Sequence, residues 1–177
     1  MLRTNMRGEE TMSDNESGQA AAPAGVFFNH LAMTVTDIAR SRRFYEELLG
    51  FKFWWDFQVP DALTAKVLMM PPPIKLTATY LWRPDLTLEL MHFGEPAARE
   101  ARRKRSLGQP GLTHIALSVA DVPGLLAKVP DFGGAVHWES QGEPSEWGQA
   151  IYIGDPDGQP IEIVTMAWRG KLPPAPG

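Results

Sequence analysis

Two histidines and two glutamates stand at equivalent places in two similar segments, and their side chains suit a metal site. His30 opens HLAMTVTD and His114 opens HIALSVAD, while Glu89 lies in the later run LTLELMHF and Glu162 in QPIEIVTM. Two neutral imidazoles and two carboxylates balance the charge of a divalent cation, and a chain without cysteine offers only nitrogen and oxygen ligands. We therefore predict that these four residues bind one divalent ion (Ni, Co, Fe, Mn or Zn), with water completing its shell.

The strands expected at these segments explain how the four side chains reach one side of a sheet. Side chains alternate between the two faces of a strand, so His30 shares a face with the small residues Ala32 and Thr34, and Glu89 points away from its leucine neighbours. The second copy repeats this pattern. Small residues beyond each histidine predict a cavity, and a carboxylate buried beside it needs a partner or a metal.

The similarity between the segments is an internal repeat that runs without a gap from His30 to Trp54 and from His114 to Trp138. In each copy we expect a strand, a helix capped by Asp37 or Asp121, a helix exit at Gly50 or Gly134, and three further strands. The later strands are expected at 51–58, 74–82 and 86–93 in the first copy and at 135–141, 149–154 and 160–165 in the second. The predicted fold class is therefore α+β, with two tandem βαβββ modules.

The modules form one predicted domain, residues 26–166, between tails at 1–25 and 167–177 that we expect to be disordered. Module one spans 26–94 and module two 111–166. Within module one, 59–73 is expected to form a short helix and a proline loop over one end of the sheet. The linker, 95–110, is expected to be a solvated helix, with an anion site for a charged substrate tail as the alternative. Its basic residues are Arg99, Arg102, Arg103, Lys104 and Arg105.

Composition excludes several classes of protein. A chain of 177 residues is long enough for one domain with a proper core, and its formal net charge of −4 argues against a nucleic-acid partner. No run approaches the roughly 20 apolar residues that a membrane span requires. We find no targeting signal, and we therefore expect a cytoplasmic protein.

Several other residues are predicted to have structural roles. His92 and His137 lack a matching repeat position and are interpreted as bystanders. Trp54 and Trp138 are expected to pack in the core or at an interface, and 155–158 (DPDG) is expected to be a tight turn that leads into the Glu162 strand.

These motifs resemble the vicinal-oxygen-chelate superfamily, which includes glyoxalase I, extradiol dioxygenases, methylmalonyl-CoA epimerase and the bleomycin and fosfomycin resistance proteins. The resemblance covers residues 27–166 and is carried by NHLAMTVTD, RRFYEELLGFKF, LTLELMHF, GLTHIALSVADV and YIGDPDGQPIEIV. It implies that the modules form a U-shaped mixed sheet around a metal cavity, commonly in a homodimer. The ligand positions that it implies are His30, Glu89, His114 and Glu162.

Glyoxalase I is similar in having all four ligands. The epimerases usually have an amide in place of Glu89, although ELMHFGEP and the basic linker look epimerase-like. Extradiol dioxygenases use two histidines and one glutamate, and their Tyr-x-x-Asp-Pro-x-Gly motif matches from Tyr152, which makes Tyr152 a candidate pocket residue. Their catalytic histidine would fall near 143–145, which here read Glu-Pro-Ser.

We therefore predict a metal-dependent lyase or isomerase of the glyoxalase I type that removes a proton next to a carbonyl of a chelated small-molecule substrate. Glu162 or Glu89 would act as the general base. One alternative is an Fe(II) dioxygenase that cleaves aromatic rings. The other is a non-catalytic protein that binds an aromatic drug, such as an antibiotic, or a metabolite.

Overall fold

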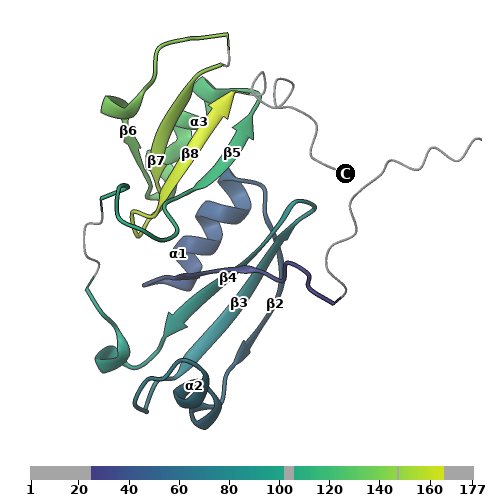
Figure 1. Ribbon diagram of the computed structural model, residues 1–177, viewed down its shortest axis with the longest axis vertical. Coiled ribbons are helices and arrows are strands. Elements are labelled where there is room, and N and C mark those ends of the chain that lie inside the picture. The colour runs from purple at the N-terminus through teal and green to yellow at the C-terminus, as the bar shows by residue number, and fades with distance from the viewer. Residues whose placement is uncertain (1–24, 102–105, 147, 166–177) are drawn as a thin grey trace, which may run out of the picture. The chain divides into compact units, whose positions relative to one another are not determined.

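The chain forms two four-stranded sheets, one in each half (Figure 1). The first strand of each sheet comes from one of the two runs with alternating side chains. The computed structural model describes residues 25–101, 106–146 and 148–165, and the residues from Asn29 through the last described strand belong to one compact unit. The α+β class with two repeated modules is confirmed. The predicted tails, apart from Gly25, and residues 102–105 of the basic linker lie outside the described residues.

The first sheet has the order β1-β4-β3-β2, with β1 parallel to β4 and the other pairs antiparallel. Its strands are β1 (Leu31–Thr34), β2 (Lys52–Gln58), β3 (Leu76–Arg83) and β4 (Leu86–Phe93). The pairing of β2 with β3 shifts between Phe53 and Trp55, which marks a β-bulge. The three later strands lie close to where the sequence predicts them.

The second sheet repeats this topology in the order β5-β8-β7-β6. Its strands are β5 (Ile115–Val119), β6 (Ala135–His137), β7 (Ala150–Gly154) and β8 (Pro160–Thr165). The strand predicted to reach residue 141 ends at His137, because a 3₁₀ turn (Trp138–Ser140) follows it. There the Ser140 hydroxyl donates to the His137 carbonyl and accepts from the Tyr152 N–H. These side-chain hydrogen bonds take the place of the backbone pairing that a longer strand would make.

One helix follows the first strand of each module. Helix α1 (Ile38–Arg43) continues as a π-helical turn (Phe44–Leu48), and α3 (Val122–Lys128) continues as a 3₁₀ turn (Val129–Phe132). The predicted caps are confirmed: Asp37 accepts a hydrogen bond from the Arg40 N–H, and Asp121 accepts one from the Gly124 N–H. No helix in the described part of the chain is long and apolar enough to cross a membrane.

The helix exits differ between the two modules. Gly50 takes a left-handed backbone conformation, with φ of 73°, as expected of a residue that ends a helix. In the second module Gly133 does this, with φ of 77°, and the prediction of Gly134 is wrong. Gly134 is instead a site of close approach, because a Cβ there would lie 2.7 Å from the Phe44 ring.

The apolar faces of both sheets and the helical segments pack into one core shared by the two modules. The stripe that contains Tyr45 and Leu49 in module one meets the stripe that contains Leu126 and Val129 in module two. The sheets contribute fully buried residues that alternate along their strands, as predicted: Leu81, Leu88, Leu90, Ile153, Ile161 and Ile163.

A second apolar cluster lies under α2 (Asp61–Val67), within the segment predicted to form a helix and proline loop. Ile74, Leu76 and Phe93 are its buried members, and Ala65 and Met91 pack against them. The helix therefore covers one end of the first sheet. A 3₁₀ turn (Pro96–Ala98) follows β4 and contributes Ala98 to the same cluster.

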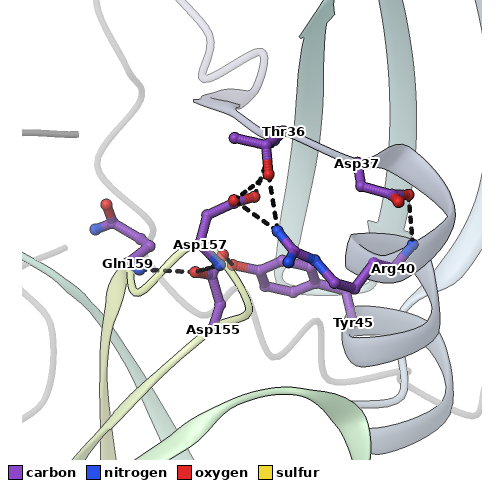
Figure 2. Close-up of polar contacts among 7 residues, drawn as sticks. All are labelled: Thr36, Asp37, Arg40, Tyr45, Asp155, Asp157 and Gln159. Atoms are coloured by element: carbon purple, nitrogen blue, oxygen red, sulfur yellow. Dashed lines mark hydrogen bonds and ion pairs between the residues drawn. The ribbon is translucent and has the colours of Figure 1, made fainter. Parts of the chain in front are cut away.

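Polar contacts join the two modules where the turn between β7 and β8 meets α1 (Figure 2). The Asp157 carboxylate accepts hydrogen bonds from the Thr36 N–H at 3.0 Å, from the Thr36 hydroxyl, and from Arg40 Nη2 at 2.8 Å. The Tyr45 hydroxyl donates to Asp155 Oδ2 at 2.8 Å. The predicted turn is confirmed by a hydrogen bond from the Gly158 N–H to the Asp155 carbonyl, and it also connects the modules.

Candidate functional site

In module one, a row of residues from four strands crosses the face of the sheet opposite the shared core, which we call the site face. The strand register aligns Ala32 with Glu89, Glu89 with Tyr80, and Tyr80 with Trp55. His30 precedes β1 and shares the site face with Ala32 by alternation. Its Nε2 lies 2.9 Å from Glu89 Oε2, and we call this pair half-site one.

Module two builds the corresponding row from Ala116, Glu162, Tyr152 and His137. His114 Nε2 lies 3.3 Å from Glu162 Oε2, and we call this pair half-site two. Each module thus brings its predicted histidine and glutamate together, and their role as metal ligands stays a prediction. All four side chains are partly buried, with between 12% and 30% of their surface exposed.

The Nδ1 atom of each histidine has a partner on the side away from the glutamate. His30 Nδ1 lies 2.6 Å from Asn29 Oδ1; because an amide oxygen can only accept, Nδ1 donates this hydrogen bond, and Nε2 is the nitrogen that faces Glu89. His114 Nδ1 lies 3.0 Å from the Thr113 hydroxyl and 3.2 Å from the Tyr152 hydroxyl. Such contacts fix the orientation of imidazoles that bind metals.

A tyrosine stands beside each half-site, and only one of the two was predicted. Tyr80 meets His30 edge-on with ring centroids 5.5 Å apart, and Tyr152 meets His114 edge-on at 5.3 Å. The sequence singles out Tyr152 alone. The signal that was missed is hairpin register, because each tyrosine lies directly across from the glutamate of its module.

Both tyrosines are neutral hydroxyl groups at physiological pH. Burial raises the pKa of Tyr80, and the nearby Glu89 carboxylate, to which its hydroxyl is hydrogen-bonded, raises it further. Burial and the Glu162 charge raise the pKa of Tyr152 in the same way. Each hydroxyl can therefore donate a hydrogen bond beside a carboxylate.

Half-site two opens into a cavity of about 440 Å³. The small residues Ala116 and Ser118 line this cavity as predicted, and Glu162 borders it, but His114 is not among its lining residues. Glu143 and Ser145 lie on its wall, so the segment where an extradiol dioxygenase would carry its catalytic histidine borders the cavity with a carboxylate and a hydroxyl instead. The lining consists of Ala116, Ser118, Glu143, Ser145, Gly148, Gln149, Ala150, Glu162 and Val164.

The single chain does not unite the two half-sites. Among residues 25–101, 106–146 and 148–165, no three histidine, aspartate or glutamate side chains are grouped so that they could hold a metal ion. Each module therefore presents two of the four predicted ligands, and the joint site predicted from the repeat stays a prediction.

The remaining candidates occupy other positions. His92 shares a strand face with the core residues Leu88 and Leu90, whereas His137 lies at the edge of the second sheet with Nδ1 3.4 Å from Glu139. Trp54 and Trp138 are each 60% exposed, so neither is a core residue of this chain.

Arg99 is the one linker cation that the structure describes. Its guanidinium donates to the carbonyls of Phe93 and Gly94, so its side chain fixes the end of β4. Arg99 and Glu100 both border a cavity of about 470 Å³ that also includes Thr34 and Asp157. The lining carries charges of both signs, and this does not favour an anion site there.

Residues 27–163 match the Glyoxalase/Bleomycin resistance protein/Dioxygenase superfamily. The chain belongs to this superfamily. A sequence relative is the uncharacterized protein YaeR of Escherichia coli K12, which is 28% identical over 142 residues that cover 76% of this chain and 92% of YaeR.

Solved structures of other superfamily proteins share the fold. A glyoxalase family protein of Bacillus cereus aligns with a TM-score of 0.68 at 16% identity, over 81% of this chain and 98% of that protein. The trypanothione-dependent glyoxalase I of Leishmania major aligns with a TM-score of 0.54 at 26% identity, over 77% and 84%. A fosfomycin resistance protein of Listeria monocytogenes, solved with Mn(II) and sulfate, aligns at 0.51 and 15% identity, over 82% and 98%.

Proposed function

We propose that this superfamily member is a divalent-metal-dependent lyase or isomerase of the glyoxalase I type. The observation that carries the proposal is the same arrangement in both modules, in which an imidazole Nε2 faces a glutamate oxygen at 2.9 Å in one and 3.3 Å in the other. Similarity to a glyoxalase I and to a protein solved with Mn(II) supports both the reaction class and the use of a metal.

The donor atoms in each half-site fit a divalent cation. At His30, the ring nitrogen Nε2 and a carboxylate oxygen face each other, and both are donor atoms that a divalent cation binds. Nitrogen and oxygen donors without sulfur suit Ni, Co, Fe, Mn or Zn. The ligands that we propose are His30, Glu89, His114 and Glu162.

Two ligands are too few for a stable catalytic ion, and we therefore propose that the protein works as a homodimer. Half-site one of one copy would meet half-site two of the second copy, which gives two complete sites related by symmetry.

The residues of the two half-sites divide the chemistry between them. A bound divalent ion supplies Lewis acidity to two neighbouring oxygens of the substrate. Glu162 accepts the proton from the carbon next to the carbonyl and returns it to the adjacent carbon, while Glu89 takes the corresponding position on the other module. The Tyr152 hydroxyl holds the His114 ring by its Nδ1 atom.

Metal analysis and one variant test the proposal. The purified protein should bind one divalent ion per chain, and it should exchange the substrate's α-proton with solvent in a panel of thiol adducts of 2-oxoaldehydes and acyl-CoA thioesters. Glu162→Gln should lower turnover at least about 100-fold at saturating metal. Glu139→Gln is the matched control, because that side chain is 79% exposed.

Four outcomes would contradict the proposal. A protein that takes up no divalent metal is not such an enzyme, and a Glu162→Gln protein that turns over normally does not use this residue as its base. Oxygen uptake with catechols after anaerobic iron loading would indicate the dioxygenase instead. Ligand binding that a chelator leaves unchanged would indicate a binding protein.

A further inference from the structure

The β-bulge in β2 places two successive tryptophans on the site face of module one. Phe53 pairs with Leu81, a core residue, whereas Trp55 pairs with Tyr80, so the register changes between them. Without the bulge, Trp54 and Trp55 would point to opposite faces. With it, both rings contact Tyr80, at centroid distances of 6.4 Å and 4.9 Å.

These residues form a continuous wall of rings that ends at half-site one. Phe57 stacks on Trp55 with centroids 4.8 Å apart, and Trp55 stacks on Tyr80, nearly parallel in both cases. Tyr80 in turn meets His30 edge-on. We call Trp54, Trp55, Phe57 and Tyr80 the aromatic wall.

The row of residues next to the wall is mainly apolar. The register row next to that of Glu89 aligns Thr34 with Met91, Met91 with Ala78, and Ala78 with Phe57. Met91 also packs against the cluster under α2, which closes that end of the sheet. Despite these neighbours, Trp55 remains 42% exposed and Phe57 37% exposed.

The stacked rings at Trp55 distinguish module one from module two. The position of Trp55 in the row is taken by His137 in module two, where β6 is short and a 3₁₀ turn follows. The four proposed ligands and the tyrosines beside them have counterparts in both modules, whereas Trp55 is replaced by His137. The aromatic wall therefore differs between the modules, although the His–Glu pairs beside it do not. Such a surface is suited to recognising the part of a substrate that does not react.

We propose that the substrate carries a planar aromatic group beside its two chelating oxygens, and that Trp55 selects it. Adjacent strands lie about 4.8 Å apart, so Trp55 stands roughly 10 Å across the sheet from Glu89. An aryl group attached directly, or through one or two atoms, to oxygens held at the half-site spans this distance. The chelating part of this inference rests on the proposed function, whereas the aromatic wall does not.

Two small chelators that differ in one group test the inference. Benzohydroxamic acid and acetohydroxamic acid bind metal ions through the same two neighbouring oxygens, but one carries a phenyl ring and the other a methyl group. Their affinities for the Co(II)-loaded protein are measured by calorimetry, and the visible Co(II) spectrum reports chelation. The preference of aqueous Co(II) for each acid in the same buffer is the reference.

The ratio of the affinity for benzohydroxamic acid to that for acetohydroxamic acid should be at least about tenfold larger for the wild-type protein than for aqueous Co(II). Trp55→Ala should abolish this extra preference and leave the affinity for acetohydroxamic acid unchanged, whereas Trp55→Phe should retain most of it. Phe53→Ala is the matched control, because Phe53 lies on the same strand, is 41% exposed and faces the Arg42 side of the sheet. It should behave like the wild type.

Other outcomes overturn the inference. It is wrong if the wild-type preference does not exceed that of the aqueous ion. It is also wrong if Trp55→Ala weakens both acids equally and shifts the oligomeric state in sedimentation, because the wall then serves subunit contact. If the protein binds no Co(II), the proposed function fails. Saturation-transfer NMR with benzohydroxamic acid on the metal-free protein then tests the aromatic wall by itself. The phenyl protons must receive saturation from the wild-type protein and must lose it with Trp55→Ala.

Discussion

Each proposed ligand histidine is held by different neighbours, although the two occupy equivalent repeat positions. Among the described residues, His30 Nδ1 contacts only the exposed amide of Asn29, whereas His114 Nδ1 contacts the hydroxyls of both Thr113 and Tyr152. An imidazole whose second nitrogen is fixed loses less freedom when it binds a metal. In half-site one, the orientation of the His30 ring therefore depends on Asn29. In half-site two, Thr113 and Tyr152 both orient the His114 ring.

Asn29→Leu should weaken divalent metal binding about tenfold or more, because it removes the only contact found on His30 Nδ1 among the described residues. The melting temperature should change little, since Asn29 is exposed. Competition with a fluorescent chelator measures the affinity. Thr113→Val is the control and should have a smaller effect, because the Tyr152 hydroxyl still reaches His114; equal affinities for Asn29→Leu and the wild type would contradict the argument.

The two His–Glu pairs could be predicted because strand alternation fixes a side chain's face from its residue number alone. His30 and Glu89 lie on strands that pair directly, so a correct face is enough to bring them together. Tyr80 could not be found in this way. The spacing from tyrosine to glutamate differs between the two copies, and only the hairpin register shows that both tyrosines lie opposite their glutamates.

At the scale of the elements, irregular geometry is what the sequence pattern misses. Alternation predicts opposite faces for Trp54 and Trp55, and the bulge places both on one face. A pair of adjacent glycines is likewise ambiguous, because either can end a helix. Packing against Phe44 decides the matter, since Gly134 must stay without a Cβ and Gly133 takes the left-handed turn.

The turn between β7 and β8 carries a buried carboxyl group whose protonation is linked to folding. Burial is the largest effect on Asp155 and raises its pKa above the ordinary value, against the opposing hydrogen bonds from the Gln159 N–H and the Tyr45 hydroxyl. A raised pKa in the folded state means that folding favours the protonated acid. The associated stability is present below the unfolded-state pKa and is lost as the pH rises through the folded-state pKa.

Asp155→Asn should therefore gain stability relative to the wild type as the pH rises from about 3.5 toward neutrality. The asparagine oxygen still accepts from the turn's N–H groups, and its amide can donate to the Tyr45 hydroxyl. Urea unfolding at several pH values measures the difference in free energy of unfolding, and the exposed Asp131→Asn is the control. A difference that is flat with pH would contradict the prediction. Asp155→Ala should cost about 1–3 kcal/mol, because it leaves the buried Tyr45 hydroxyl with only its weak contact to Met33 Sδ.

At the scale of the whole molecule, the repeat predicts two modules but does not say which copies of the chain combine their half-sites. The pattern of residues is the same whether a complete site forms within one chain or between two. Shared packing decides how the modules associate, because the helical segments of both contribute to one core through Phe44, Tyr45, Leu126 and Val129. That core and the Asp157 contacts hold the modules together without bringing three proposed ligands into one group in the described part of the chain.

Mixing two inactive variants distinguishes the two modes of assembly. One variant has half-site one removed (His30→Ala with Glu89→Ala) and the other has half-site two removed (His114→Ala with Glu162→Ala). If sites form between copies, random pairing of equal amounts makes half of the dimers mixed, and each mixed dimer has one intact site of two. Metal capacity and turnover should then recover to about one quarter of the wild-type values after joint refolding. Mixing His30→Ala with Glu89→Ala should restore nothing, since every site keeps a damaged half-site one, and no recovery in the main experiment would mean that each site forms within a single chain.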